Sequence, residues 1–184
     1  MPNLNFREAN VSDAPSIVTI HNSNAIANLN SIDGGFLLSD VNEKAVVDQL
    51  SRSTRYFVAT LPNKEIIGFV CVSRPKISAE MLTKIQWEDT MSYEKVQDPR
   101  HLFLHVVATR RNWSSQGVGQ FMYRSLYDSF PSSFISLFVV VNPIANQRSM
   151  NFHTKQGFKK IGTIKADRFL NFKNYEDVLM LKET

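Results

Sequence analysis

A strand-to-helix segment decides the fold, and residues 102–130 read LFLHVVATRRNWSSQGVGQFMYRSLYDSF. Leu102–Thr109 is almost wholly apolar, which is typical of a strand buried on both faces. After a polar loop, a helix is predicted from Gln120 to Phe130, and a second apolar run follows at Ile135–Val141. Two apolar runs separated by a helix predict a βαβ unit with parallel strands.

The rest of the chain supplies further strands and helices around this unit. The order ββ, then β-α-β-α-β, predicts an α/β or α+β sheet domain with helices packed on it, and residues 1–184 are expected to form one domain. The predicted elements are a strand at Leu4–Ala9, a helix from Ser12 to about His21, a loop or broken helix at Asn22–Gly35, a capped helix beginning at Ser39, a hairpin of Tyr56–Leu61 and Ile66–Val72, a helix at Asn146–Gln156, and closing strands at Lys159–Ile164 and Tyr175–Leu181.

Composition narrows the class of protein. Of the 184 residues, 43% are apolar and 21% charged, which is usual for a globular domain, and no apolar run reaches the roughly 18 residues of a membrane span. The N-terminus lacks a secretory pattern, so we expect a cytoplasmic protein. The single cysteine, Cys71, excludes an internal disulfide and a multi-cysteine metal site; it is expected to be a small core residue, and no metal site is predicted.

The chain carries a modest positive charge of +4. Solubility alone explains such an excess, and attraction of an anionic ligand is the alternative. No dense basic run or aromatic–basic stripe is present, so a nucleic acid is not an expected partner.

The loop before the predicted helix carries a glycine turn at Ser114–Gln120. Glycines let backbone N–H groups approach a ligand, and a helix N-terminus adds positive potential, so this turn suits a pyrophosphate. A tight turn with no ligand is the alternative. The turn is not a P-loop, because no Lys-Ser or Lys-Thr follows the glycines, and it lacks the third glycine of a dinucleotide-binding fingerprint.

A second polar constellation lies in residues 146–158, NQRSMNFHTKQGF. At helical spacing, Asn146, Ser149 and Phe152 or His153 share one face. An amide, a hydroxyl and an imidazole are an unusual covering for a core, whereas Gly157 is an ordinary helix C-cap.

These two motifs, in this order and spacing, resemble the GNAT superfamily of N-acetyltransferases. The family's Arg/Gln-x-x-Gly-x-Gly/Ala falls on Ser114–Gly119, and its Asn-x-x-Ala-x-x-Leu/Phe-Tyr followed by Gly-Phe begins at Asn146. The resemblance implies the GNAT fold: a central mixed, mostly antiparallel sheet with a splayed parallel pair and helices on both faces. It also implies transfer of an acetyl group from acetyl-CoA (coenzyme A) to a primary amine by direct attack in a ternary complex.

The sequence departs from the family pattern at positions that bind phosphate or transfer protons in relatives. Ser114 stands where Arg or Gln is usual; Arg110 and Arg111 are either exposed loop arginines or substitutes for that phosphate contact. His153 stands where many relatives have a tyrosine. Phe103 stands near the position of a glutamate base in some histone-modifying relatives, so no carboxylate base can be assigned by motif.

The resemblance also implies roles for individual residues. His153 is the candidate acid for the leaving thiolate. His105 is a second catalytic candidate, with a satisfied core histidine as the alternative. A backbone N–H near Val107–Thr109 would polarise the thioester carbonyl. The cofactor-binding candidates are Val107, Ala108, Thr109, Ser114, Ser115, Gln116, Gly117, Val118, Gly119, Gln120, Asn146, Ser149 and Phe152.

The long connection from Pro75 to Arg100 is the candidate acceptor site. It holds Trp87 and Tyr93 beside four carboxylates, and aromatic faces with carboxylates suit a cationic amine. A surface helical excursion with a solvated acidic face is the alternative. The four carboxylates are Glu80, Glu88, Asp89 and Glu94.

The expected partner is a small-molecule or peptide amine, with no nucleic acid and no membrane, and the protein is expected to be a monomer or homodimer. Two other functions stay open. One is a GNAT-fold domain that binds acyl-CoA without catalysis, as a sensor or interaction module; the other is an unrelated nucleotide-binding enzyme.

Overall fold

The computed structural model describes residues 3–52, 54–75 and 77–184, so Lys76 in the predicted connection lies outside the described residues. The described residues form an eight-stranded sheet with the order β1-β2-β3-β5-β6-β8-β7-β4. The sheet is mostly antiparallel with one parallel pair, which confirms the predicted fold class. The strands are β1 (Asn5–Glu8), β2 (Thr54–Thr60), β3 (Ile66–Ser73), β4 (Ile85–Trp87), β5 (His101–Thr109), β6 (Phe134–Asn142), β7 (Lys159–Phe169) and β8 (Phe172–Glu183), and the α-helices are α1 (Ala14–Ser23), α2 (Glu43–Leu50), α3 (Ala79–Thr83), α4 (Thr90–Gln97), α5 (Val118–Ser129) and α6 (Gln147–Lys155).

The chain divides into two compact units. Unit 1 comprises Met1–Ser73 and Leu104–Pro131, and unit 2 comprises Arg74–Phe103 and Ser132–Thr184. Because β5 begins in unit 2 and ends in unit 1, the segment that decides the fold runs through both.

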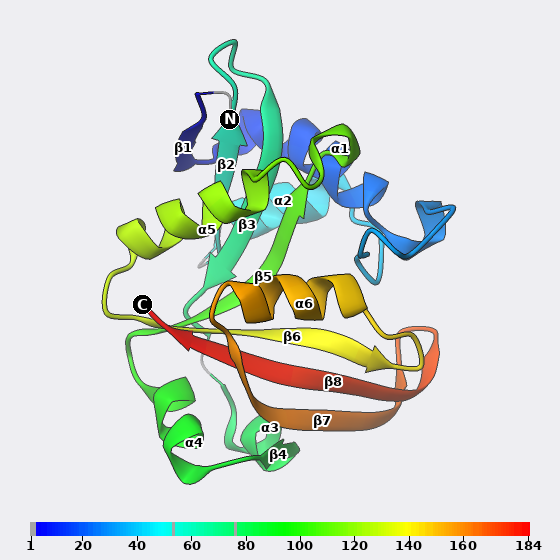
Figure 1. Cartoon of the computed structure of the whole chain (residues 1–184), viewed down its shortest axis with the longest axis vertical. Coiled ribbons are helices and arrows are strands. Elements are labelled where there is room, and N and C mark those ends of the chain that lie inside the picture. Colours follow the sequence, from blue (N-terminus) through cyan, green and yellow to red (C-terminus); the bar gives the residue numbers. More distant parts are fainter. Residues whose placement is uncertain (1–2, 53, 76) are drawn as a thin grey trace. The chain divides into compact units, whose positions relative to one another are not determined.

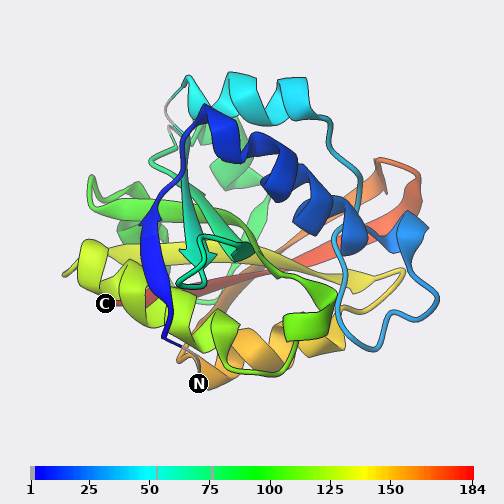
Figure 2. The ribbon, with the colours of Figure 1, turned by 90° about the horizontal axis from the view of Figure 1, so that it is seen from above.

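In unit 1, β1, β2 and β3 form an antiparallel set covered by helices. Figure 2 shows α1 and α2 on one face of β2 and β3 and α5 on the other. The helix α1 buries Ile17 and Ile20 against Phe69 and Val58, in a cluster that also holds Cys71. Burial of aliphatic and aromatic side chains of this kind contributes roughly 1.5–3 kcal/mol each.

In unit 2, β5 and β6 pair in parallel, with Phe103 opposite Ser136. The strands β6, β8, β7 and β4 then continue antiparallel. Figure 1 shows α6 lying along β6, and α3 and α4 beside β4. A second apolar cluster holds Leu179 and Leu181 of β8 with Leu82 and Val96 of the two short helices.

Two predicted boundaries were wrong. The second helix begins at Glu43 and not at Ser39, because Asn42 is the capping residue: its side chain accepts a hydrogen bond from Ala45 N at 2.8 Å. The closing strands also extend beyond the predicted ranges, because the β7–β8 hairpin continues pairing through the exposed polar stretch up to Phe169 and Phe172. Backbone pairing does not require the apolar alternation on which the prediction relied.

The predicted connection between β3 and β5 contains regular structure. It forms α3, β4 and α4, and both helices are capped by side chains: Ser78 accepts from Met81 N at 3.2 Å and Asp89 from Ser92 N at 2.7 Å. No helix within the described ranges has the length and apolar character needed to cross a lipid bilayer.

Candidate active site

The glycine turn in unit 1 begins helix α5 without a side-chain cap. Gly117 is the N-cap residue and has a φ of 84°, a left-handed conformation that favours glycine. The first hydrogen bond of the helix runs from Phe121 N to Gly117 O at 3.0 Å. The N–H groups of Val118, Gly119 and Gln120 therefore precede the hydrogen-bonded turns, where a helix N-terminus attracts anions.

The sequence of α5 fixes how this turn is held. Val118, Met122, Tyr123 and Leu126 recur at helical spacing and are fully buried, so one face of the helix packs on the sheet of unit 1. Because Val118 itself is buried, the first turn of the helix is anchored. The predicted residues Ser114, Ser115 and Gln116 lie in the loop just before it.

Arg110 and Arg111 are half-buried, and each donates to backbone carbonyls of unit 1. The Arg110 Nε donates to Ile66 O at 2.6 Å. The Arg111 Nε donates to Ser23 O at 3.1 Å, and its NH2 group donates to Gly35 O at 3.4 Å. Burial lowers the pKa of Arg111 below its usual value. Both arginines therefore hold backbone segments of unit 1 together, which corrects the reading of exposed loop arginines, and a phosphate contact stays a prediction.

His105 lies on β5 with one ring nitrogen held in place. Its Nε2 lies 2.8 Å from the hydroxyl oxygen of Ser73 on β3. Desolvation of the ring lowers the pKa of His105 below its usual value, which keeps the imidazole neutral at pH 7. A neutral imidazole can accept a proton, so His105 has the protonation state of a general base.

The end of β5 carries the backbone groups predicted to meet the thioester. Val107 and Thr109 are half-buried, and Ala108 is buried. The carbonyl of Thr109 accepts a hydrogen bond from Asn24 Nδ2 at 3.0 Å. This bond ties the end of the strand to the segment that follows α1.

In unit 2, the first residue of the predicted polar face of α6 caps the helix. Asn146 is the N-cap: its side chain accepts from Ser149 N at 3.3 Å, and its own N–H donates to Val140 O at 2.9 Å. Ser149 and Phe152 are half-buried. Asn146 therefore orients α6 on the end of β6, whatever else it contacts.

His153 is a buried residue of α6. It is 4% exposed, and the rings of Phe152 and Phe158 pack edge-on against it with centroids 5.5 and 5.6 Å away. Burial lowers the pKa of His153 to about 4. The ring is therefore neutral at pH 7, so the candidate acid holds no imidazolium proton for the leaving thiolate.

Trp87 and Tyr93 do lie together in unit 2, with ring centroids 5.5 Å apart at an interplanar angle of 88°. Trp87 packs against the apolar cluster of β8, and its Nε1 donates to Leu82 O at 3.2 Å. Three of the neighbouring carboxylates have partners: Glu80 pairs with Lys84, Glu88 with Lys160, and Asp89 caps α4. These contacts give the connection a structural role, and its acceptor role stays a prediction.

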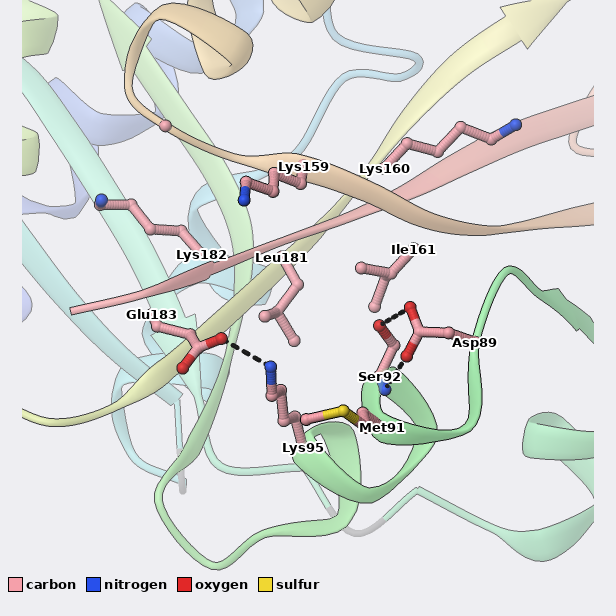
Figure 3. A pocket seen from close by; sticks show the side chains of 11 residues that line it. Asp89, Met91, Ser92, Lys95, Lys159, Lys160, Ile161, Leu181, Lys182 and Glu183 are labelled. Atoms are coloured by element: carbon pink, nitrogen blue, oxygen red, sulfur yellow. Dashed lines mark hydrogen bonds and ion pairs between the residues drawn. The ribbon is translucent and has the colours of Figure 1, made fainter.

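The described surface of unit 2 also holds an open groove of about 430 Å³ between α4, β7 and β8. Figure 3 shows Leu181 and Ile161 between the Lys95–Glu183 ion pair and the Asp89–Ser92 hydrogen bonds. Of the residues named for the predicted sites, Asp89 of the acceptor connection lines it. Its size alone does not make it the active site, because Lys95 pairs with Glu183 and Asp89 caps α4.

Sequence reasoning missed one carboxylate, Asp177 on β8. Two oxygens of Asp177 accept a hydrogen bond from the hydroxyl of Tyr175, at 2.8 and 2.9 Å. The alternation of Tyr175, Asp177, Leu179 and Leu181 would have revealed it, because it places a carboxylate in an otherwise apolar strand face. Within the described ranges, no group of three or more His, Cys, Asp or Glu side chains could hold a metal ion.

Known proteins with this fold were found by comparison. The ribosomal-protein-S18-alanine N-acetyltransferase of Escherichia coli superposes with a TM-score of 0.66 at 12% identity, covering 98% of this chain and 94% of that one. Arabidopsis thaliana NAA60 in complex with acetyl-CoA gives 0.66 at 13%, covering 98% of each chain. A spermidine N-acetyltransferase SpeG chimera from Vibrio cholerae and hSSAT gives 0.65 at 16%, covering 98% and 95%.

These identities establish a shared fold alone. No curated protein sequence matches the chain. The family model for the acetyltransferase (GNAT) family, however, matches residues 24–158, which include β5, the glycine turn and α6. The chain therefore belongs to the acetyltransferase (GNAT) family.

Proposed function

We propose that this chain, acting as one catalytic domain over residues 1–184, transfers an acetyl group from acetyl-CoA to a primary amine by direct attack in a ternary complex. The observation that carries the proposal is the glycine-capped start of α5 at the end of β5, within a chain of the GNAT family. Acetyl-CoA supplies the acetyl group as an activated thioester.

The residues of unit 1 fit this cofactor. The N–H groups of Val118, Gly119 and Gln120, at a helix start with no side-chain cap, suit a pyrophosphate. We assign the backbone of Val107–Thr109 to the pantetheine arm and the thioester carbonyl. Ser114, Ser115 and Gln116 complete the turn, and backbone N–H groups here replace the missing Arg or Gln side chain.

His105 is the proposed general base. An ammonium has no lone pair, so the acceptor amine must lose a proton before it can attack. The neutral imidazole of His105, oriented by the Ser73 hydroxyl, can take that proton directly or through a water.

His153 keeps its proposed place at the leaving sulfur, with a different protonation state. Since burial holds its pKa near 4, His153 acts as a neutral N–H donor to the departing thiolate and not as an imidazolium acid. Asn146, Ser149 and Phe152 of the same helix are the proposed cofactor contacts of unit 2.

The acceptor is proposed to be a small-molecule or peptide amine. Structures of the same fold bear the names of enzymes for a ribosomal-protein alanine and for spermidine. Trp87 and Tyr93 stay proposed acceptor contacts, and a cytoplasmic monomer or homodimer completes the proposal.

The proposal is tested by measuring acetyl-CoA binding calorimetrically and then screening an amine library for release of free thiol. Binding together with turnover of at least one amine supports an acetyltransferase. Binding without turnover of any amine would instead favour an acyl-CoA sensor or interaction module. Displacement of acetyl-CoA by ATP or NAD would favour an unrelated nucleotide-binding enzyme.

A further inference from the structure

Asp177 is a carboxylate on an apolar face of the unit 2 sheet. On β8 it lies opposite Val140 of β6 and Ile164 of β7. Leu179, two residues further along β8, belongs to the apolar cluster of unit 2, and Ile164 packs against that cluster. Because side chains two residues apart on a strand share a face, Asp177 lies at the margin of this cluster.

Few polar groups surround the Asp177 carboxylate. Its cross-strand neighbours carry no charge, and the Tyr175 hydroxyl is its hydrogen-bond donor. Among the described residues, no Lys, Arg or His side chain forms an ion pair with it. A carboxylate can accept about four hydrogen bonds, so one hydroxyl leaves much of this capacity unused. Burial raises the pKa of Asp177 to about 6, which leaves it mostly ionised at pH 7.5.

The Tyr175 ring, whose hydroxyl meets this carboxylate, packs against a second aromatic ring. The ring of Phe169, at the end of β7, lies 4.6 Å from the ring of Tyr175, with an interplanar angle of 34°. Tyr175 is 5% exposed, whereas Phe169 is 46% exposed. An exposed aromatic face attracts an ammonium group by about 0.5–1 kcal/mol, in addition to the attraction of the carboxylate.

Asp177, Tyr175 and Phe169 combine a carboxylate with aromatic rings, which is the combination that the sequence predicted around Trp87 for a cationic amine. The carboxylates near Trp87 are mostly engaged in ion pairs and a helix cap, whereas Asp177 meets a hydroxyl and apolar groups. An ammonium is the ligand that fits best: it donates up to three hydrogen bonds and compensates the charge of the half-buried carboxylate. A metal ion is a poor fit, because a single carboxylate does not make a coordination shell.

We propose that Asp177, with Tyr175 and Phe169, binds the ammonium group of the acceptor amine and selects acceptors whose amine is carried on an apolar substituent. This inference rests on the proposed function, since it assigns the ammonium group of the acceptor to the β7–β8 hairpin, while Trp87 and Tyr93 stay proposed contacts of the rest of the acceptor. Asp177 receives the cationic form of the amine, and the later loss of the proton stays with the general base.

A binding experiment tests the site without turnover. The full chain, labelled with ¹³C in its carboxyl groups, is titrated at pH 7.5 with n-hexylamine as the cationic probe and with 1-hexanol as its neutral counterpart. The Asp177 resonance, assigned by its loss in Asp177→Asn, should shift saturably with n-hexylamine alone. Bound ammonium should also lower the pKa of Asp177 by about one unit, as an opposite charge in contact does. No shift, or an equal shift with 1-hexanol, would overturn the proposal.

A kinetic experiment then places the site in the reaction. With an amine that wild type acetylates, Asp177→Asn should raise KM for the amine about tenfold, as expected for loss of a charge-assisted hydrogen bond, while acetyl-CoA affinity is unchanged. The matched control is Asp167→Asn, which removes an exposed carboxylate from the same hairpin and should leave KM unchanged. Equal KM values for wild type and Asp177→Asn would overturn the assignment.

The two proposals fail separately. If wild type binds no acetyl-CoA or acetylates no amine, the proposed function fails, and the n-hexylamine titration still decides whether Asp177 binds ammonium. If acetylation proceeds and Asp177 does not respond to n-hexylamine, the ammonium site fails and the acetyltransferase stands.

Discussion

The Nε2 atom of His105 lies 2.8 Å from the hydroxyl oxygen of Ser73, which joins β5 to β3 within unit 1. The contact fixes the orientation of an imidazole that desolvation keeps neutral, because the pKa of His105 lies below its usual value. As the proposed general base, this imidazole carries no charge before it accepts the proton.

His105→Ala should lower kcat about a hundredfold, within the usual range for general bases, with little change in acetyl-CoA affinity. Ser73→Ala should lower kcat less, because it frees the ring without removing it. In wild type, the His105 base should be neutral above its lowered pKa, so its limb of the kcat/KM profile should fall only below about pH 6.5. If His105→Ala kept the kcat of wild type, His105 would be a structural histidine of β5 and not the general base.

The second prediction separates charge from backbone strain at the glycine turn. Gly117→Asn and Gly117→Asp have nearly the same shape, and Asn and Asp tolerate a left-handed φ of 84° better than most residues. The Asp variant should bind acetyl-CoA at least about tenfold more weakly than the Asn variant, because it adds a negative charge beside the pyrophosphate, a difference of about 1.4 kcal/mol. Calorimetry on both folded variants measures it, and equal affinities would remove the pyrophosphate from the start of α5.

The third prediction concerns the stability of the fold against acid. The pKa of His153 is about 4 in the folded chain and about 6.5 when unfolded. The contribution of His153 to stability is therefore fully present above pH 6.5 and is lost as the pH falls toward 4, because the unfolded chain binds the proton first. His153→Phe keeps an aromatic ring without a proton site. Between pH 6.5 and pH 4, its free energy of unfolding should therefore fall by up to about 3 kcal/mol less than that of wild type.

Urea unfolding of wild type and His153→Phe at pH 7.5 and pH 4.5 tests this prediction. His101, whose pKa burial also lowers to about 4, is common to both proteins and cancels in the comparison. The same acid sensitivity in the two proteins would contradict a buried, neutral His153.

The fourth prediction separates the two aromatic residues of the connection between β3 and β5. Trp87→Ala should destabilise the fold by roughly 2–3 kcal/mol, less than for a fully buried Trp, because the half-buried Trp87 packs against the apolar cluster and donates to Leu82 O. Tyr93 is 37% exposed, so Tyr93→Ala should keep most of the stability and allow a clean measurement of KM for the amine. A raised KM would support the acceptor assignment, and an unchanged KM would leave the pair as packing residues.

The sequence predicted the fold well where apolar periodicity and local turn chemistry agree. The strands β5 and β6 follow from the apolar runs Leu102–Thr109 and Ile135–Val141. The helix α5 was predicted as well, but it begins at Val118 and not at Gln120. The start of α2 was not predicted, because Ser39 and Asn42 are both acceptable caps in sequence and tertiary contacts decide between them.

The candidate site was harder to predict than the fold, because protonation states depend on burial. His153 was correctly placed on the helix, but nothing in its neighbours along the chain shows that Phe158 closes over the ring. Asp177 was missed although the alternation of Tyr175, Asp177 and Leu179 marks a carboxylate on an apolar strand face. The register then places it opposite Ile164. Charges and their pKa values belong to tertiary structure, which a local pattern does not encode.

The hydrogen bonds of Arg111 to the segment after α1 determine which substitutions that segment can accept. The guanidinium grips the carbonyl oxygens of Ser23 and Gly35, and a Cβ atom on Gly34 would come within 2.7 Å of it. Main-chain carbonyls are present whatever the side chain, so most substitutions between residues 24 and 33 leave this anchorage in place. The side chains of this segment can therefore change, by evolution or by design, while its backbone keeps its position, provided that Arg111 and Gly34 are retained.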